Sequence, residues 1–490
     1  MSQSSLRTDP APAPKTTPRN LTGQLGTAGI VFMVIAAAAP LTVIGGNVPL
    51  AVGLGNGAGA PVGFIIAALV LLVFAVGFVT MTPHVKEAGA FFAYVTLGLG
   101  KRAGTGTALV ALVSYTAIQL GVYGLFGWAA NDLITHFGGP ELPWWLYPII
   151  AIAIVGFLGY RHIDISAKVL GIALILEIAI VVVMDASIFI QGGAEGISVT
   201  SFTPAAIGSG PIGIAILFAL TGFIGFEATA VYRDEAKNPE ITIPRATYLA
   251  VIIIGVFYAI SSWALVEAAG PDHAVSVAQQ TLNGKGNMML DTANHYIGTT
   301  LRDIMQVLLV SSLFACVLSF HNVVARYQFV LARKGLLPSA LGHVHSTNCS
   351  PSTSSVVQTV TALVLLALFA VAGLDPLVGV FGSMAGVATV GMLILMLTTS
   401  IAVLVFFANR PALAAGRSWR TRIAPALAIV GLIISMWLVV SNFTLVTGGS
   451  FDVSIMLGLV PVAALVIGLF LRARASETDD PLNAQLTSAA

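Results

Sequence analysis

Residues 218–240, "FALTGFIGFEATAVYRDEAKNPE", decide the fold of this chain. The first half is apolar enough for a membrane, yet Gly222 and Gly225 interrupt it and Glu227 places a carboxylate among apolar side chains. Glycine weakens a helix, and backbone groups that are freed inside a bilayer must be buried in protein or line a cavity. We therefore expect this segment to unwind at mid-membrane beside a cavity.

The composition of the chain is that of a polytopic membrane protein. Of its 490 residues, 57% are hydrophobic and only 9% are charged, whereas about 25% are charged in an ordinary soluble domain. The apolar composition makes the lipid bilayer an expected partner. The net charge of +1 provides no basic surface, so nucleic acid is not expected as a partner. The two cysteines, Cys316 and Cys349, do not form a disulfide framework or a metal-binding pattern.

Twelve apolar segments follow one another, and all but the short fourth reach about the 17–25 residues that a spanning helix needs. They lie at residues 26–54, 62–82, 105–135, 144–159, 164–191, 211–234, 245–268, 300–332, 355–373, 377–408, 423–446 and 454–472. With both termini cytoplasmic, all but two of the 22 lysines and arginines lie on the inner side, the exceptions being Lys285 and Arg302. The sequence thus predicts an all-α, multi-pass protein of the plasma membrane, with disordered cytoplasmic ends at residues 1–20 and 475–490.

The first apolar segment is interrupted as well. Residues 34–57, "VIAAAAPLTVIGGNVPLAVGLGNG", carry Pro40, Gly45, Gly46 and Pro49 in an apolar run. Two interrupted segments that lie five spans apart are typical of transporters built from inverted repeats, whose substrate site forms at the breaks. Small residues that let two helices pack closely would produce a similar pattern, and this alternative remains open.

Three stretches resemble the amino acid–polyamine–organocation family of secondary transporters. They are "GFEATAVYRDEAKNPEITIPRA" at residues 225–246, "TPHVKEAGAFFAYVTLGLG" at 82–100 and "FHNVVARYQFVLARKGLLP" at 320–338. The resemblance extends over residues 20–475, with the three stretches in order. It implies a leucine-transporter-like fold in which two inverted repeats of five helices are followed by two extra helices. The transporter domain would span residues 21–474, with the repeats at 26–191 and 211–408 and the extra helices at 423–472.

The resemblance also implies a substrate site at the breaks. The residues carried over are Pro40, Leu41, Thr42 and Val43 in span 1, Thr221, Gly222, Ile224 and Gly225 in span 6, Phe320 in span 8 and Ser383 in span 10. On span 3, Tyr115 and Gln119 share one helical face and are added to the site. Relatives that take α-amino acids carry a glycine–serine–glycine turn near Pro40, which is absent here, so amines and ω-amino acids stay open as substrates.

Two carboxylates inside the spans are candidates for ion or proton coupling. Glu177 aligns with a position where some bacterial relatives carry a lysine that takes the place of a sodium ion. Glu177 could carry a proton, hold a cation with Ser311 and Ser312, or make a structural hydrogen bond. We favour the proton, because burial without a partner favours the neutral form of a carboxyl group. Glu227 follows the break in span 6 and could carry a proton or cap the unwound backbone.

Charged residues at the inner ends of the spans suggest a gate. Asp234 and Glu235 lie just inside span 6, and Arg326 lies near the inner end of span 8. We expect these opposite charges to pair when the inner side is closed, although a solvated charge run is the alternative. Of the other ionisable residues, Asp185 lies near the outer end of span 5 and can reach water, and His321 is expected to pack with a hydrogen bond.

The expected function is that of a permease rather than an enzyme. No His/Asp cluster of metal-site spacing lies within a span, and no catalytic pattern appears. We expect alternating-access transport of a small amino acid or related amine, coupled to a proton. A sodium-coupled or exchange-type amine or polyamine transporter is the main alternative, and a channel, a sensor and an intramembrane enzyme follow. No cofactor beyond the coupling proton or sodium ion is expected, and no oligomer is indicated.

Overall fold

The computed structural model describes residues 25–85, 90–161, 167–231, 236–343 and 351–471. Within these residues the chain forms helices and turns, and its β-type pairing is one isolated bridge between Leu25 and Ala236. The expected ends at residues 1–20 and 475–490 lie outside the described residues, as do the expected gate residues Asp234 and Glu235.

Ten helices in the described residues are long and apolar enough to cross a membrane. Two shorter apolar helices, α7 (Leu146–Arg161) and α10 (Ile212–Gly222), occupy the places of the fourth and sixth spans. The twelve apolar segments expected from the sequence are therefore all helical. The fourth is short as expected, and the sixth is shortened by its break.

In chain order, the other elements of the spans are α1 (Thr27–Ala38), α2 (Pro40–Thr42), η1 (Val43–Asn47), α3 (Val48–Leu54), α4 (Ala60–Met81), α6 (Lys101–His136), α8 (Ala167–Gln191), α11 (Ala228–Val231), α12 (Pro239–Ala269), α15 (Thr299–Arg333), α16 (Ser352–Val371), η7 (Pro376–Gly382), α17 (Ser383–Ala408), η8 (Trp419–Ile423), α19 (Ala424–Ser441) and α21 (Phe451–Phe470). Shorter helices connect them, namely α5 (Ala90–Leu99), α9 (Pro204–Ile207), α13 (Ala274–Leu282), α14 (Met288–Ile297), α18 (Pro411–Ala414) and α20 (Phe443–Thr447).

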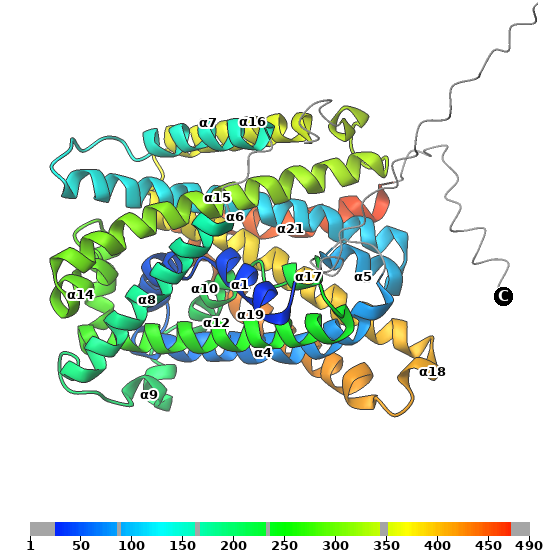
Figure 1. Ribbon diagram of the computed structural model, residues 1–490, viewed down its shortest axis with the longest axis horizontal. Helices are drawn as coiled ribbons and strands as arrows, with labels where there is room; N and C mark the ends of the chain where they lie inside the picture. The colour runs from blue at the N-terminus through cyan, green and yellow to red at the C-terminus, as the bar shows by residue number, and fades with distance from the viewer. Residues whose placement is uncertain (1–24, 86–89, 162–166, 232–235, 344–350, 472–490) are drawn as a thin grey trace, which may run out of the picture.

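The long helices lie side by side in a bundle (Figure 1). α7 and α16 pack together at one edge, next to α15, and α4 packs against α12 at the opposite edge. α9 and α14 lie at one end of the bundle, and α5 and α18 lie at the other. The interrupted α1 and α10 lie in the middle, so continuous helices surround both breaks.

The surface of the bundle is apolar, while polar side chains are buried inside it. Ile150 and Phe157 on α7 and Trp437 on α19 are exposed, whereas Glu177 and Glu227 are buried. In a bilayer, apolar side chains face lipid and ionisable ones turn toward the interior of the bundle. The distribution of side chains therefore matches a protein that is surrounded by lipid.

The first spanning segment breaks at Ala39. This residue has φ 46° and ψ 70°, in the left-handed region that residues with a side chain rarely adopt. The following Pro40 disfavours helical backbone at the residue before it and has no N–H to donate, so α1 stops and a new helix starts. Strained backbone of this kind persists only where its surroundings hold it, and it gathers at functional sites.

The other interrupting residues of this segment do not form the break. Gly45, Gly46 and Pro49 lie within helical turns. A Cβ on Gly46 would lie 2.6 Å from Leu125 Cδ2, and a Cβ on Gly45 would lie 3.1 Å from the Cε of Met289. The two glycines therefore allow α6 and α14 to pack closely, and the packing alternative is correct for them.

The sixth spanning segment breaks at its glycines, as expected. After α10 the chain makes a non-helical turn over residues 223–227 before α11 begins. Gly225 has φ 110°, which a residue with a side chain adopts only under strain. A Cβ on Gly222 would lie 3.0 Å from Val43 Cγ2 and 3.2 Å from a ring carbon of Tyr258. One glycine thus supplies the turn, and the other allows close packing.

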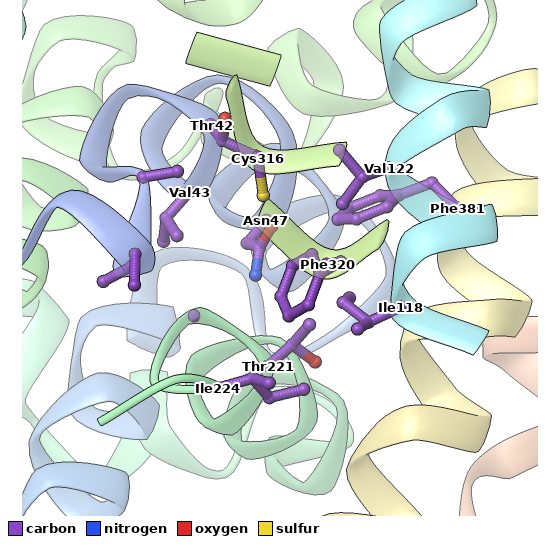
Figure 2. A pocket seen from close by; sticks show the side chains of 14 residues that line it. Thr42, Val43, Asn47, Ile118, Val122, Thr221, Ile224, Cys316, Phe320 and Phe381 are labelled. Carbon is purple, nitrogen blue, oxygen red and sulfur yellow. The ribbon is translucent and has the colours of Figure 1, made fainter. Parts of the chain in front are cut away.

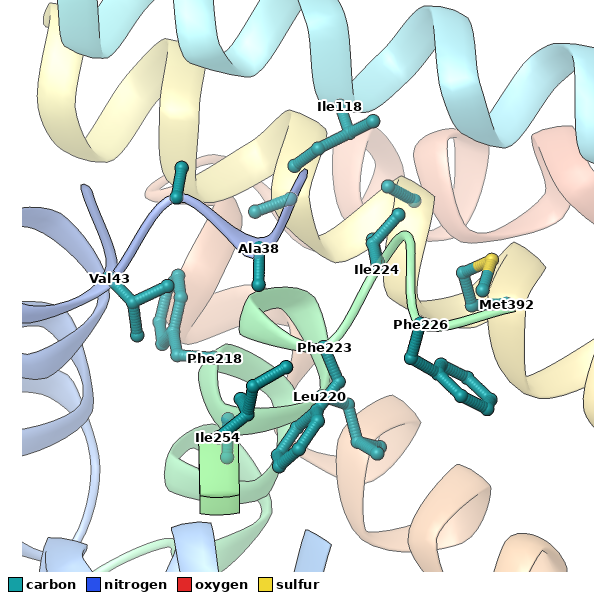
Figure 3. Close-up of a cluster of buried hydrophobic side chains, with 14 of the residues drawn as sticks. Ala38, Val43, Ile118, Phe218, Leu220, Phe223, Ile224, Phe226, Ile254 and Met392 are labelled. Carbon is teal, nitrogen blue, oxygen red and sulfur yellow. The ribbon is translucent and has the colours of Figure 1, made fainter. Parts of the chain in front are cut away.

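Hydrogen bonds hold the two breaks beside each other. Asn47 Nδ2 donates to the Phe218 carbonyl oxygen at 2.8 Å, which joins the outer part of span 1 to α10. The Tyr258 hydroxyl on α12 donates to the carbonyl oxygens of Ala38, at 3.1 Å, and Gly222, at 3.4 Å. Both acceptors end half-helices, so these bonds satisfy carbonyl groups that the breaks leave free. Figure 3 shows the apolar side chains packed around this region.

Candidate substrate site at the paired breaks

A small cavity lies between the two breaks (Figure 2). Its lining comes from five spans: Ala37, Ala38, Ala39, Thr42, Val43 and Asn47 from span 1, Ile118 and Val122 from α6, Thr221, Gly222 and Ile224 from span 6, Cys316 and Phe320 from α15, and Phe381 from η7. Its volume of about 30 Å³ is small beside the roughly 300–1,000 Å³ of ligand pockets. The site is therefore contracted in this conformation.

Half of the expected substrate residues line this cavity. They are Thr42, Val43, Thr221, Gly222, Ile224 and Phe320. Pro40, Leu41, Tyr115, Gln119, Gly225 and Ser383 are not among the residues that line it in this conformation, and their place in the site stays a prediction. The Ser383 hydroxyl faces the carbonyl oxygen of Thr447 at 3.5 Å, toward α20 instead of the cavity.

Several lining residues were not expected from the sequence. Ile118 and Val122 face the cavity, each one residue before Gln119 and Tyr123, so the face of α6 was misplaced by one position. Cys316 lies one helical turn before Phe320 and could have been found from it. The spacing of four residues is the only sequence signal for these positions, since their side chains are apolar or small.

The cavity offers polar groups but no charged side chain among the described residues that line it. The Thr42 hydroxyl is buried and has no hydrogen-bond partner in the described part of the chain. The Thr221 hydroxyl donates to the Leu217 carbonyl oxygen at 2.8 Å and lies 2.7 Å from the Thr389 hydroxyl. Thr42 is thus the hydroxyl that is free to bind a ligand.

The helix ends at the cavity carry opposite partial charges. α1 ends at Ala38 and α10 ends at Gly222, and the C-terminus of a helix is partially negative. The helical run that restarts at Pro40 presents a partially positive N-terminus on the other side. An ammonium group and a carboxylate can therefore each find a favourable end, without a charged side chain in the cavity wall.

Glu227 closes the turn in span 6. Its carboxylate accepts a hydrogen bond from the Tyr115 hydroxyl on α6 and another from the Gly225 N–H at 3.0 Å. It is the last residue of the turn and directly precedes α11. Glu227 thus ties the unwound backbone of span 6 to span 3, outside the cavity wall.

Glu177 lies on α8 and is buried at 4% exposure. Its Oε2 accepts a hydrogen bond from the Ser312 hydroxyl at 2.9 Å, and its carboxylate accepts another from the Leu41 N–H. Leu41 is at the start of the helical run after the first break, so Glu177 caps that helix end. The expectation that Ser311 faces Glu177 is wrong, because Ser311 is exposed and donates to the Leu308 carbonyl oxygen of its own helix.

Gln119 belongs to a chain of buried amides instead of the cavity. Its Nε2 donates to the Val317 carbonyl oxygen at 3.3 Å, and its Oε1 accepts from Gln358 at 2.7 Å. The Gln358 Oε1 in turn accepts from Gln328 at 3.1 Å. These bonds join α6, α15 and α16, so Gln119 helps to hold three spans together.

The remaining ionisable residues have distinct positions. Arg326 is exposed near the C-terminal end of α15, while its expected carboxylate partners lie outside the described residues. His321 is buried and hydrogen-bonds the Ser355 hydroxyl at 2.8 Å, as expected of a packing residue. Asp185 is buried at 6% exposure, so the expectation that it reaches water is wrong. Within the described residues, no group of His, Cys, Asp and Glu side chains could hold a metal ion.

The chain matches one known protein family over most of its length. The model of the family described as amino acid permease matches residues 25–469, which is nearly all of the described chain. The chain belongs to the amino acid permease family. This permease is therefore a multi-pass membrane transporter and not an enzyme.

Curated relatives of this permease differ in what they carry. It is 25% identical to the branched-chain amino acid permease BcaP of Bacillus subtilis, over 90% of this chain and 92% of the relative. It is 23% identical to the serine/threonine exchanger SteT of the same organism, over 58% and 62%. It is 24% identical to the low-affinity putrescine importer PlaP of Escherichia coli, over 72% and 76%. The three identities are so close that similarity alone does not select a substrate.

Proposed function

We propose that this permease is a secondary active transporter of the plasma membrane that moves a small amino acid or a related amine by alternating access. The observation that carries the proposal is the cavity enclosed by the two broken spans. Its contraction to about 30 Å³ fits a closed state of a transport cycle, since a cavity of this size holds no such substrate. Movement of the broken spans would open it toward either side of the membrane.

The lining favours a substrate with a neutral side chain. Ile118, Phe320 and Phe381 supply an apolar wall, and no charged side chain among the described lining residues would meet a second charge. A diamine carries two ammonium groups, and burying one against an apolar wall is unfavourable. We therefore propose a small neutral amino acid or monoamine, closer to the substrates named for BcaP and SteT than to putrescine.

We further propose that transport is coupled to a proton through Glu177. A sodium site needs several oxygen ligands, because hard cations prefer to be coordinated by oxygen. The partners of Glu177 are instead donors, the Ser312 hydroxyl and the Leu41 N–H. A carboxyl group in this setting can hold or release a proton as the site hydrates.

Uptake into proteoliposomes tests the proposal. A thermal-shift screen against amino acids and amines first identifies a stabilising substrate, because a ligand that binds the folded state stabilises it. Labelled substrate should then enter liposomes when the outside is acidic, and sodium should have no effect. A purified protein that carries none of these compounds under any gradient would refute the transport proposal. Sodium-driven uptake would refute only the coupling.

Exchange is the second candidate, because the chain resembles a serine/threonine exchanger over 58% of its length. An obligatory exchanger moves labelled substrate only when the liposome holds unlabelled substrate. Liposomes that contain no substrate should accumulate labelled substrate under a proton gradient if transport is proton-coupled. They should accumulate none if the protein is an obligatory exchanger. The same preparation therefore separates the two.

A further inference from the structure

α8 carries a second buried carboxylate that the proposed function does not use. Asp185 lies eight residues after Glu177, about 12 Å farther along the helix. Both residues are buried, whereas Ile175 and Val182 of the same helix are exposed toward lipid. The two acidic residues thus lie on the inward side of α8.

The hydrogen bonding of Asp185 is incomplete. Its Oδ2 accepts from the Ser261 hydroxyl of α12 at 2.6 Å, but its Oδ1 is buried and has no partner among the described residues. An unpaired carboxylate oxygen inside a bilayer is costly, and ionisable groups kept there usually serve a purpose. Oδ1 is therefore an open position for a proton.

Glu267 shows what a structural carboxylate looks like in the same protein. It is fully buried on α12 and accepts from the Ser198 N–H at 2.8 Å, from the Ser198 hydroxyl at 3.1 Å and from the Trp263 ring N–H at 3.1 Å. Both of its oxygens have partners. Asp185 has one donor and one carboxylate oxygen without a partner among the described residues, so unlike Glu267 it keeps an oxygen that can take up a proton.

Among the described residues, the donor to Asp185 is the Ser261 hydroxyl of α12. Tyr258 lies three residues before Ser261 on the same helix, and its hydroxyl donates to the carbonyl oxygens of Ala38 and Gly222 at the two breaks. One turn of α12 therefore connects the contact of Asp185 with the helix ends around the candidate substrate site.

Other ionisable groups on the helices packed against α8 have their own partners or lie elsewhere. α8 packs against α1, α2, α12, α14 and α15. The groups on these helices are Glu240, Arg245, Tyr248, Tyr258 and Glu267 on α12, Asp291, His295 and Tyr296 on α14, and Arg302, Asp303, Cys316, His321, Arg326, Tyr327 and Arg333 on α15. No charged group among them forms an ion pair with Asp185 in the described structure.

We propose that Asp185 is the outer proton acceptor of this transporter and that water entering the opened site carries the proton on to Glu177. An O–H bond forms at Oδ1 when the outer side opens and hydronium delivers a proton, leaving water. That bond breaks when the proton passes to another water molecule, and the hydronium so formed gives the proton to the Glu177 carboxylate, where a new O–H bond forms. No electrons are transferred. The inference rests on the proposed proton coupling and identifies where the proton enters.

The test compares Asp185→Asn with Glu267→Gln in proteoliposomes. Asparagine keeps the size of Asp185 and can still accept from Ser261, but it cannot take up a proton. We expect Asp185→Asn to lose the rise in initial uptake rate on external acidification, so that the ratio of acidic to neutral rates falls to one. Glu267→Gln, whose parent residue is fully hydrogen-bonded, should keep the wild-type ratio.

Substrate counterflow at equal pH separates proton entry from a structural role. Counterflow exchanges labelled for unlabelled substrate without net proton movement, so Asp185→Asn should retain it. Loss of both uptake and counterflow in Asp185→Asn would overturn the inference in favour of a structural role. An unchanged pH ratio in that variant would also overturn it while leaving the proposed function intact. A wild-type rate that ignores pH would overturn the coupling and this inference together, while uptake itself would still establish transport.

Discussion

Two neighbouring serines on α15 differ in what they touch. Ser312 donates to Glu177 at 2.9 Å, while Ser311 donates to the Leu308 carbonyl oxygen of its own helix, also at 2.9 Å. From the sequence alone, we expected both serines beside Glu177. Adjacent residues point about 100° apart around a helix, so the two serines cannot both face Glu177, and which one does depends on how α15 packs against its neighbours. The pair offers a matched test of what the contact with Glu177 contributes.

We expect Ser312→Ala to move the pH profile of uptake, whereas Ser311→Ala leaves it unchanged. Loss of the Ser312 donor removes a hydrogen bond to the ionised form of Glu177, so that proton-driven uptake should persist to higher external pH. A hydrogen bond to a charged group contributes about 1.5–3 kcal/mol, which corresponds to a shift of about one to two pH units. Initial uptake rates measured across external pH check this, and identical profiles for the two variants would contradict it.

Glu227 is suited to capping, because both of its carboxylate oxygens accept hydrogen bonds, from the Tyr115 hydroxyl and the Gly225 N–H. We expect Glu227→Gln to lower the uptake rate at every pH while the ratio of acidic to neutral rates is kept. Tyr115→Phe, which removes only one of the two donors, should act in the same direction and more weakly. Flattening of the pH profile in Glu227→Gln would instead assign a proton-carrying role to this residue.

At the scale of elements, the sequence predicts where the helices of spans 1 and 6 break, but it does not predict which side of a helix lines the cavity. Pro40 restricts the backbone of the residue before it, and Gly225 adopts a backbone conformation that other residues avoid, so the interruptions of spans 1 and 6 can be predicted from the sequence. Gly46 was ambiguous, because only the nearby Leu125 side chain shows that its role is close packing. Which side of α6 faces the cavity depends on the packing of α15 and α17 against it, and no local signal records this.

A polar network where α6 ends and α14 and α15 begin was not predicted from the sequence. Asp132 accepts from the Gln306 amide at 2.9 Å and from the Asn287 amide at 3.4 Å. Arg302 donates to Gln306 at 2.8 Å and to Asp303 at 3.1 Å. Asp132 is far from Asn287 and from α15 in the sequence, so these groups meet only in the fold. The network links α14 to the neighbouring ends of α6 and α15.

We expect Asp132→Asn to weaken this network and to lower the midpoint of thermal unfolding. Loss of the carboxylate removes a charge-assisted acceptor and costs about 1–3 kcal/mol. Asp272→Asn is the matched control, because Asp272 is an exposed carboxylate just before α13. Thermal unfolding of the two purified variants checks the prediction. Equal midpoints would mean that the network adds nothing to the stability of this state.

At the scale of the whole molecule, the order of the helices fixes which loops share a side of the membrane. Lys101 begins α6 directly after α5, and Arg417 follows α18, while Lys285 lies between α13 and α14. α5 and α18 lie at one end of the bundle and α14 lies at the other (Figure 1). The geometry therefore puts Lys101 and Arg417 together and Lys285 opposite, whichever end is cytoplasmic.

The charge distribution predicts which end that is. By the twelve-span order of the sequence, all but two of the 22 lysines and arginines are expected on the side of Lys101 and Arg417, and such residues are enriched in cytoplasmic loops. Reporter fusions after Lys101, Arg245 and Arg417 should therefore report a cytoplasmic location, and a fusion at Lys285 should report an external one. An inverted result at all four positions would keep the twelve-span order and reverse the orientation. A cytoplasmic signal at Lys285 alone would break the order itself, because one missed span inverts every later loop.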